Sequence, residues 1–313
     1  MSAEFPIIAL TGSSGAGSST ITRAFEHIFW RDRVKAAYIQ GSGFHRYSRA
    51  EMEQEIIKAC AEDRVLSHYG PEGNCLDKLE TLFFQYSAIG TGMRRYYLHT
   101  DEQAGKWGQE AGALTPWKNI EGKTDLLLYR GLHGAAIDGD VDISQYPDLL
   151  IGIVPIVNLE WMRKIKRDIA LRGYSVDEVR HSIQCRMHDY VHHITPQFSR
   201  THINFQMVST VDTSDPFAKD SIMPTEDESF IVISFQRGMQ PDFIELLSLL
   251  PNSFMSRRDT LVVPGSALLH AIEIILMPLV HDLVVKGREL RKVKKVPKKR
   301  KAGLHGVLGQ SGS

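Results

Sequence analysis

The sequence predicts an α/β fold, with a mostly parallel, doubly wound sheet flanked by helices in a single large domain. Short apolar segments alternate with helical ones, which is typical of strands joined by crossover helices. Two of these segments, Asp125–Tyr129 (DLLLY) and Leu149–Val157 (LLIGIVPIV), are continuous apolar runs, as expected for central parallel strands buried on both faces. A Gly/Ser-rich loop directly follows the first apolar segment. We find no internal repeat.

The spacing of apolar residues places the elements in order. It predicts a first strand at Phe5–Thr11, a helix at Thr20–Trp30 and a second strand at Val34–Ile39. Strand-like segments return after residue 202, as INFQMVSTV, FIVISF and TLVVP. The other predicted helices are Arg49–Ala61, Asp77–Ile89, Leu159–Arg172, Val176–His193 and one that begins at Ala267.

The composition is that of a soluble globular protein. The chain has 313 residues, 42% hydrophobic and 24% charged, and can bury a sizeable core. Its longest apolar-rich stretch, Ala267–Val285, is interrupted by charged and His residues, so we expect a packed helix and no membrane span. We also expect no signal peptide. Cys60, Cys75 and Cys185 form no CxxC pair, which argues against disulfides or zinc and favours a cytoplasmic location.

Basic residues are concentrated near the C-terminus. Residues 286–301 hold ten Lys/Arg and one Glu, whereas the whole chain is balanced at 37 basic and 37 acidic residues, so residues 1–285 are net acidic. We therefore predict a domain at residues 1–285 and a basic, disordered tail at 286–313. The tail could contact nucleic acid, an anionic lipid surface or an acidic partner. A solvated appendage is the simpler interpretation, because no aromatic residues are interleaved with the charges.

The loop after the first strand has the spacing of the phosphate-binding motif G-x-x-x-x-G-K-[ST], with Ser18 in place of Lys. Its glycines would let backbone N–H groups surround a phosphate at a helix N-terminus, and Ser19 could reach a magnesium ion. A strand-to-helix turn without a ligand is the alternative. The predicted nucleotide-binding residues are Gly12, Ser13, Ser14, Gly15, Ala16, Gly17, Ser18, Ser19 and Thr20.

A basic helix carries the most specific pattern in the chain. Lys164, Arg167 and Asp168 fall on one side of it, at i, i+3 and i+4, and Arg172 follows at its end. Several cations beside one carboxylate suit the binding of phosphates, with the carboxylate available to a metal, a hydroxyl or a neighbouring Arg. A solvated charged face is the alternative.

In this helix the sequence closely resembles the phosphoribulokinase family, through the run K-I-x-R-D-x-x-x-R-G-x-S-x-D. GSSGAGSST, FHRYSR, YLHT, GLHG, VPIVNLEW and ITPQFSRTHINFQ are similar to segments of its proteobacterial branch, in the same order, over about residues 5–285. The resemblance implies a P-loop kinase fold that transfers the γ-phosphate of ATP to ribulose 5-phosphate in the Calvin cycle, with Mg²⁺. It also implies a homo-oligomer.

The same resemblance implies roles for individual residues. Residues 13–20 match the ATP loop. His45, Arg49 and His99 match positions of the substrate site. Four residues match the family's signature helix: Lys164, Arg167, Asp168 and Arg172. The basic residues of that helix bind the substrate and stabilise the charge of the transition state.

Two acidic positions of the family are altered in this sequence. The family segment E-G-D-[SA]-F-H-R reads QGSGFHR here, so Ser42 replaces the presumed general base and Gln40 replaces the preceding Glu. In Y-E-G-L-H-G, Arg130 replaces the Glu that serves magnesium and phosphate. A hydroxyl does not accept a proton as a carboxylate does, and a guanidinium repels a metal ion. Asp168 could substitute as base or metal ligand, and Arg130 could instead contact the nucleotide phosphates in place of the cation.

These changes leave three functional hypotheses. The first is a strongly impaired ATP-dependent sugar-phosphate kinase. The second is a pseudoenzyme or regulatory subunit that holds nucleotide or sugar phosphate without turnover. The third, a nucleic-acid or membrane-surface binder that uses the basic tail, is weakened by the acidic body and the kinase motifs.

Two smaller patterns have structural interpretations. His188 and His192 are spaced as in H-E-x-x-H, with Asp189 for Glu, but a zinc hydrolase needs a third ligand and the longer Glu. We expect these histidines and Tyr190 to serve packing or subunit contacts. Cys185 is expected to be a packed thiol and not a nucleophile.

Overall fold

A single large sheet forms the centre of the protein, in the strand order β11-β12-β10-β9-β8-β1-β5-β2. The structure is a computed structural model that describes residues 4–12, 18–154, 156–172, 174–218, 222–236 and 238–295. Neighbouring strands from β9 to β2 are parallel, and the three at the other edge are antiparallel. The predicted mostly parallel sheet is therefore confirmed. The strands are β1 (Ile7–Thr11), β2 (Ala36–Gln40), β5 (Leu126–Gly131), β8 (Leu149–Val154), β9 (Ile203–Ser209), β10 (Ser229–Phe235), β11 (Phe254–Arg257) and β12 (Thr260–Pro264).

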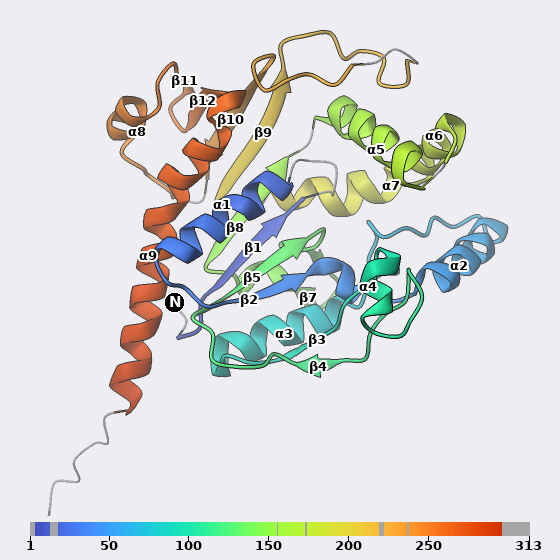
Figure 1. Cartoon of the computed structure of the whole chain (residues 1–313), viewed down its shortest axis with the longest axis horizontal. Helices are drawn as coiled ribbons and strands as arrows, with labels where there is room; N and C mark the ends of the chain where they lie inside the picture. The colour runs from blue at the N-terminus through green and yellow to red at the C-terminus, as the bar shows by residue number, and fades with distance from the viewer. Residues whose placement is uncertain are drawn as a thin grey trace, which may run out of the picture.

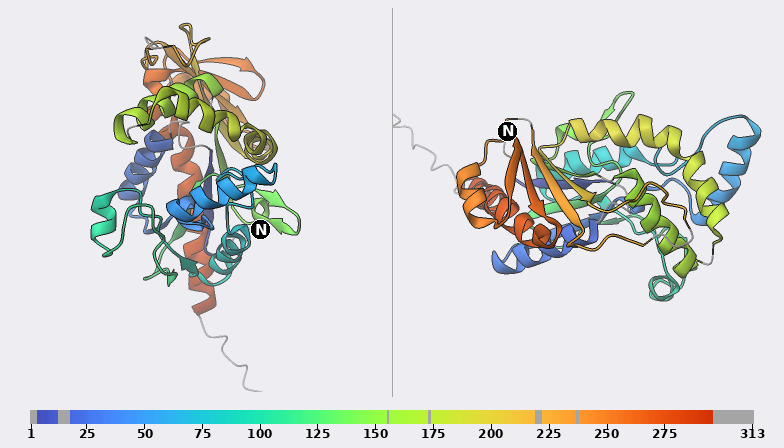
Figure 2. Two further views of the ribbon diagram at one scale, coloured as in Figure 1. Left: turned by 90° about the vertical axis from the view of Figure 1, so that its right-hand side faces the viewer. Right: turned by 90° about the horizontal axis from the view of Figure 1, so that it is seen from above.

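Helices cover both faces of this sheet (Figures 1 and 2). The helices α1 (Ser18–Arg31) and α9 (Leu268–Lys295) pack on one face, and α3 (Leu76–Ile89) packs on the other. A further group gathers beyond the carboxyl ends of the parallel strands, on the right in Figure 1: α2 (Arg49–Ala61), α4 (Asp101–Gly105), α5 (Val157–Arg172), α6 (Val176–Cys185) and α7 (Met187–Asp189). The remaining elements are α8 (Phe243–Leu249) and the ribbons β3 (Met93–Arg94) with β4 (Lys118–Asn119) and β6 (Ile137–Asp138) with β7 (Val141–Asp142).

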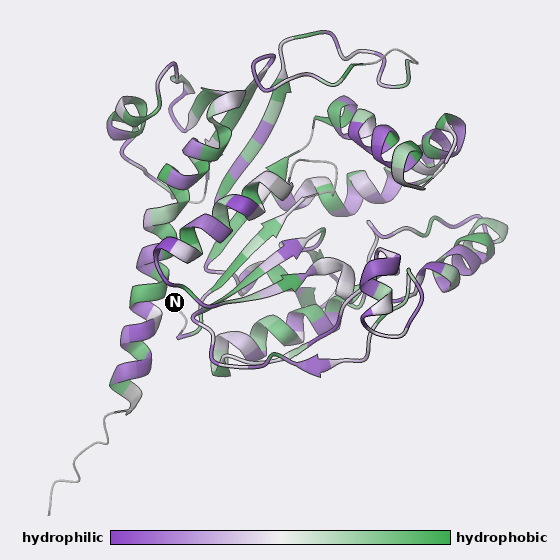
Figure 3. Cartoon of the chain, viewed as in Figure 1, coloured by the Kyte–Doolittle hydropathy of each residue, from purple (hydrophilic) through white to green (hydrophobic). Residues whose placement is uncertain are grey.

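The central strands alternate their side chains between two hydrophobic clusters. Ile8 and Leu128 lie in the cluster with Phe25 of α1, on the α9 side of the sheet. Ile7 and Tyr129 lie in the other cluster, with residues of α3. Because successive side chains of a strand point to opposite faces, every second residue belongs to the same cluster. The buried strands appear as hydrophobic bands through the middle of Figure 3.

Capping residues set the ends of several helices. Ser48 begins α2 in a capping box with Glu51, and Ser175 begins α6 in the same way with Glu178. Gly90 ends α3 in the left-handed conformation, with a φ of 72°. These local signals explain why the predicted bounds of α2 match the structure and those of α3 differ by one residue.

The predicted helix at Val176–His193 is wrong as one continuous helix. The α-helix α6 ends at Cys185, and the chain continues through the short α7 into a π-helical turn at Tyr190–Ile194. Asp189, within this segment, is buried and accepts a hydrogen bond from Ser67 Oγ at 2.7 Å. This tertiary contact accompanies the change from α-helix to π-helical turn, and the periodicity of the sequence cannot reveal it.

Two other predictions need correction. The strand predicted at Leu149–Val157 ends at Val154, and Val157 already begins α5. Cys185 is exposed and not packed, because it lies at the end of α6, two residues after the buried Ile183 and off the face that Ile183 covers. Tyr190, by contrast, is buried and meets the ring of Tyr69 edge-on, as expected for a packing residue.

The boundary predicted after residue 285 falls inside α9, which continues to Lys295. Arg288 binds Asp125 through two hydrogen bonds of 2.9 and 2.8 Å, and Arg291 donates to Asp125 at 3.2 Å and to the Glu4 carbonyl at 2.8 Å. The first part of the predicted tail is therefore an ordered helix fixed to the start of β5. Residues 296–313 lie outside the described part of the chain.

The length and composition of α9 would allow it to cross a membrane. One face of it nevertheless packs in the core, where Ile272, Leu276 and Val280 are completely buried beside α1 and the sheet. This agrees with the prediction of a packed helix.

Candidate functional site

Three predicted site segments meet where the parallel strands end. β5 lies between β1 and β2, with Arg130 opposite Leu10 on one side and Gln40 on the other. The N–H of Gly12 donates to the Gly131 carbonyl at 3.1 Å, which ties the start of the phosphate loop to the end of β5. The carboxyl ends of parallel strands are the usual ligand-binding edge of such a sheet.

Glycines allow this close approach. A Cβ atom on Gly41 would lie 2.7 Å from Gly131 Cα and 2.5 Å from the Tyr129 hydroxyl oxygen. A Cβ on Gly12 would lie 2.5 Å from the Ile153 carbonyl oxygen. The loop that follows β1 and the loop that follows β2 can therefore pass the neighbouring strands only because these positions lack side chains.

The predicted phosphate loop is described only at its two ends. Gly12 follows β1 and α1 begins at Ser18, so the N-terminus of a 14-residue helix lies next to the ends of the strands. Such a terminus favours an anion. The predictions for Ser13, Ser14, Gly15, Ala16 and Gly17, and those for the side chains of Ser18 and Ser19, lie outside the described residues.

Arg130 lies on the face of the sheet that α1 covers. Leu128, two residues earlier, packs with α1 in one hydrophobic cluster, whereas Tyr129 packs with α3 in the other. By alternation, Arg130 belongs to the α1 side, and its register partner Leu10 belongs to the same cluster as Leu128. Arg130, which is half-buried, is thus on the side of the sheet that α1 covers.

Ser42 meets a histidine. It lies in a 3₁₀ turn at Gly41–Phe44, directly after β2, and its Oγ is 3.2 Å from Nε2 of His99. Arg49, in the first turn of α2, donates to the His99 carbonyl oxygen at 3.4 Å. The structure thus brings together three positions that the sequence assigned to the acceptor region.

His45 is part of a buried histidine cluster. Its Nδ1 is 2.9 Å from Asn74 Oδ1, and its ring stacks on that of His68 with centroids 4.0 Å apart. His133 reaches the His68 carbonyl oxygen through Nε2 at 3.1 Å. Burial lowers the pKa of His45 and of His133 to about 4. These rings are therefore neutral near pH 7.

Sequence reasoning missed His68, because no motif marks it. Its Nδ1 is buried and has no hydrogen-bond partner among the described residues. Burial, followed by the fields of His45 and Arg186, holds the pKa of His68 well below its usual value. A buried polar atom of this kind calls for a partner from water or ligand.

The signature helix α5 holds its carboxylate between two cations. Asp168 is 1% exposed, its Oδ2 accepts from Lys164 Nζ at 2.5 Å, and its Oδ1 accepts from Arg167 Nε at 2.8 Å. The predicted one-sided arrangement is confirmed. Burial alone would raise the pKa of Asp168, but the hydrogen bonds from Arg167 and Lys164 outweigh it and lower that pKa. The side chain of Arg172 lies outside the described residues.

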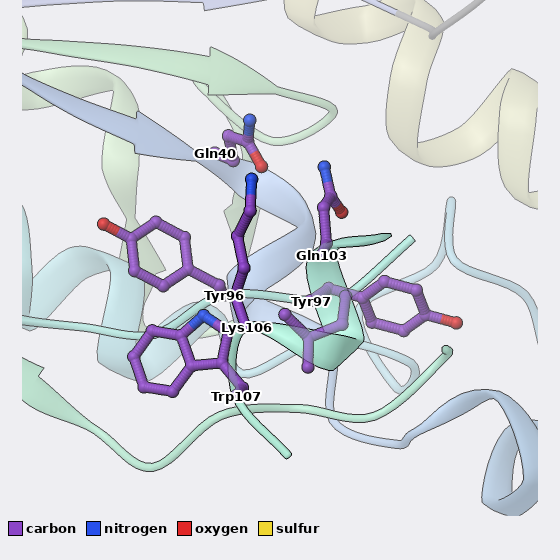
Figure 4. Close-up of a pocket in the computed structure, with 7 residues that line it drawn as sticks. Gln40, Tyr96, Tyr97, Gln103, Lys106 and Trp107 are labelled. Atoms are coloured by element: carbon purple, nitrogen blue, oxygen red, sulfur yellow. The ribbon is translucent and has the colours of Figure 1, made fainter. Parts of the chain in front are cut away.

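An open cavity of about 240 Å³ adjoins the Ser42 region (Figure 4). Its lining includes Leu98, the neighbour of His99, together with Gln40, Tyr96 and Trp107. Lys106 extends across the cavity toward Gln40. The cavity thus adds aromatic surface and an ammonium group beside the end of β2.

The described residues at the strand ends do not fit a magnesium ion. Mg²⁺ is held by carboxylates and substrate phosphates. Here both oxygens of Asp168 are engaged by cations, and Arg130 occupies the end of β5. Within the described ranges, no group of three or more His, Cys, Asp or Glu side chains could hold a metal ion. In the His188–His192 pair, Nδ1 of His192 instead bonds the His188 carbonyl oxygen at 2.7 Å.

The central sheet of parallel strands, with α1 after β1 and the basic helix α5 after β8, defines an α/β protein of the P-loop kinase class. Comparison with known proteins narrows the class. The model of the phosphoribulokinase / uridine kinase family matches residues 7–214, and this chain belongs to that family. The predicted resemblance is thereby confirmed.

Individual relatives are similar over nearly the whole length. The chromosomal phosphoribulokinase of Cupriavidus necator is 50% identical over 281 residues, which cover 90% of this chain and 96% of that protein. The probable phosphoribulokinase of Escherichia coli K12 is 49% identical over 284 residues, covering 91% and 98%. The solved structure of a phosphoribulokinase from Rhodobacter spheroides superposes with a TM-score of 0.83 at 43% identity, covering 91% of this chain and 99% of that one.

Proposed function

We propose that this protein binds ATP and ribulose 5-phosphate as a phosphoribulokinase does, and that it transfers the γ-phosphate only slowly. The family membership and the near-full-length similarity support the two ligands. The slow transfer is supported by one observation above all: Gln40 and Arg130 face each other in register, with Ser42 just beyond, where the family has carboxylates.

The reaction needs a proton acceptor. When the acceptor hydroxyl attacks the γ-phosphorus, the bond from that phosphorus to the β,γ-bridging oxygen breaks and the hydroxyl proton must leave. Ser42 cannot take it, and Asp168 is held by Lys164 and Arg167. General-base assistance contributes roughly 10²–10⁴ in rate. His99, hydrogen-bonded to Ser42, is the group placed to accept the proton in a residual reaction.

The cations of the site still serve binding. Lys164 and Arg167 on α5 and Arg130 on β5 place positive charge around the ends of the strands. Positioning and charge stabilisation carry most of the catalysis in phosphoryl transfer. A protein that keeps these groups and lacks the base is expected to bind both ligands and to turn over slowly.

A coupled assay of ADP release with ribulose 5-phosphate tests the proposal. We expect a turnover number at least about 100-fold below the ~1–100 s⁻¹ of ordinary kinases. Ser42→Asp combined with Arg130→Glu should raise it by about 10²-fold or more. Turnover in the ordinary range would contradict the diagnosis, and so would a double variant that is folded but no faster.

The alternative is a pseudoenzyme or regulatory subunit that binds without turnover. The engagement of both Asp168 oxygens favours it, because this carboxylate is the remaining acidic group of the signature helix segment Lys164–Asp168. Ligand binding by calorimetry together with no detectable product, even at high enzyme concentration and long times, would select it over the slow kinase.

Two further properties belong to the proposal. We propose a homo-oligomer, as the resemblance implies, and a cytoplasmic location, which the unpaired Cys60, Cys75 and Cys185 favour. Light scattering of the purified protein tests the first, and fractionation of cells that express it tests the second.

A further inference from the structure

Arg130 occupies a position from which a cation can serve the nucleotide. It ends the strand between β1 and β2, it lies opposite Leu10 of the strand that leads into the phosphate loop, and it belongs to the α1 side of the sheet. Gly12, the first loop residue, is hydrogen-bonded to Gly131 next to it. The register of the central strands fixes the backbone of this position.

Basic side chains lie at the same end of the sheet as Arg130. Lys106 reaches toward Gln40, the register partner of Arg130 (Figure 4), and its ammonium also binds Glu102 at 3.1 Å. On α5, Lys164 and Arg167 share the single carboxylate of Asp168, which leaves that cluster net positive. Such a field attracts ATP⁴⁻ more strongly than the magnesium complex, which carries two fewer negative charges.

We propose that Arg130 replaces the divalent cation, so that this protein binds metal-free ATP at least as tightly as magnesium-bound ATP. The inference rests on the proposed function, because it assumes that ATP occupies the loop at the N-terminus of α1. A guanidinium can hold two phosphate oxygens through parallel N–H donors, which matches a nucleotide phosphate. The same guanidinium repels a metal ion that bridges those oxygens.

Calorimetric titration of the full-length protein with ATP tests this, once with excess EDTA and once with saturating magnesium. We expect the dissociation constant in EDTA to equal or fall below the constant in magnesium. A dissociation constant that is larger in EDTA than in magnesium would overturn the inference and leave the proposed function standing. Absence of ATP binding under both conditions would instead overturn the proposed function on which it rests.

Variants at position 130 assign the effect to the guanidinium. Arg130→Gln should weaken binding in EDTA by about tenfold or more, and Arg130→Lys should retain most of the affinity. Arg130→Glu should make binding depend on magnesium. Lys123→Glu, an exposed charge reversal just before the opposite end of the same strand, is the matched control and should change neither constant.

Circular dichroism confirms that each variant is folded before its binding is measured. If folded Arg130→Gln binds ATP in EDTA as tightly as the unsubstituted protein, Arg130 does not replace the cation. If Lys123→Glu weakens binding as much as Arg130→Gln does, the effect comes from overall charge and the local assignment is also wrong.

Discussion

Nε2 of His99 lies 3.2 Å from Oγ of Ser42, so the residue predicted to replace the general base is hydrogen-bonded to an imidazole. This pair joins the turn after β2 to the segment before α4, and Leu98, the neighbour of His99, lines the cavity of Figure 4. It is the polar contact in the acceptor region on which the first prediction depends.

Replacing His99 should weaken acceptor binding without affecting the nucleotide. His99→Ala removes the hydrogen bond to Ser42, and we expect the dissociation constant for ribulose 5-phosphate to rise by about tenfold, as for loss of one good hydrogen bond. His99→Gln, which can still donate or accept, should lose less. Calorimetry with each ligand measures this, and an equal loss of ATP affinity would show that His99 does not act on the acceptor alone.

Asp168 should be important for stability. Asp168→Asn leaves Lys164 and Arg167 without their buried negative partner, and breaking a buried pair in this way costs about 3 kcal/mol. Urea unfolding measures the loss. Asp177→Asn, in the exposed pair with Arg180, is the control and should cost less than about 1 kcal/mol. Similar costs for both variants would contradict a special role for Asp168.

The buried histidines should make the protein less stable in acid. The pKa values of His45 and His133 in the folded protein are about 4, whereas the unfolded value is about 6.5. The unfolded state therefore binds more protons between these values. The stability from keeping the rings neutral is fully present above about pH 6.5 and is lost as the pH falls toward 4, by up to ~1.4 kcal/mol per pH unit for each ring.

Urea unfolding at several pH values between 7 and 4 tests this dependence. His133→Gln retains a donor for the His68 carbonyl and removes one titrating ring, so it should make the pH dependence shallower. His270→Gln, at an exposed position, should leave the slope unchanged. A slope that His133→Gln does not alter would show that another group controls acid stability.

Shortening the chain at two places should separate the ordered part of the basic segment from the rest. Ending the chain at residue 295 keeps Arg288 and Arg291 on Asp125, so we expect an unchanged free energy of unfolding. Ending it at residue 285 removes both charged hydrogen-bond donors and should cost about 2 kcal/mol. Asp125→Asn in the full chain should reproduce most of that loss. Equal stability of the two shortened chains would contradict a structural role for this segment.

The chain that ends at residue 295 also tests whether the basic residues beyond it bind a polyanion. Binding of polyphosphate by the full chain and by residues 1–295 can be compared by fluorescence anisotropy. Equal affinities would remove the tail beyond residue 295 from the nucleic-acid or membrane-surface hypothesis.

Local signals in the sequence predicted most of the central fold. The apolar runs at Phe5–Thr11 and Asp125–Tyr129 are short-range features, and the strands β1 (Ile7–Thr11) and β5 (Leu126–Gly131) follow them closely. The interruption after Cys185 is accompanied by a contact between Asp189 and Ser67, which are 122 residues apart. Periodicity contains no information about such a contact.

The sequence predicted only the part of the candidate site that depends on local spacing. Spacing on a helix places Lys164 and Asp168 on one side, but it cannot tell that both carboxylate oxygens are occupied. The stacking of His45 on His68 and the cavity around Lys106 arise from segments that are distant along the chain. Only the folded protein shows that His45 is buried and uncharged at neutral pH.

Arg130 lies one residue beyond the last core side chain of its strand, since Leu128 and Tyr129 complete the two hydrophobic clusters. Selection for a stable fold therefore acts weakly on position 130, and the same holds for Ser42 in the turn after β2. The residue at position 130 can therefore change while the same scaffold is kept.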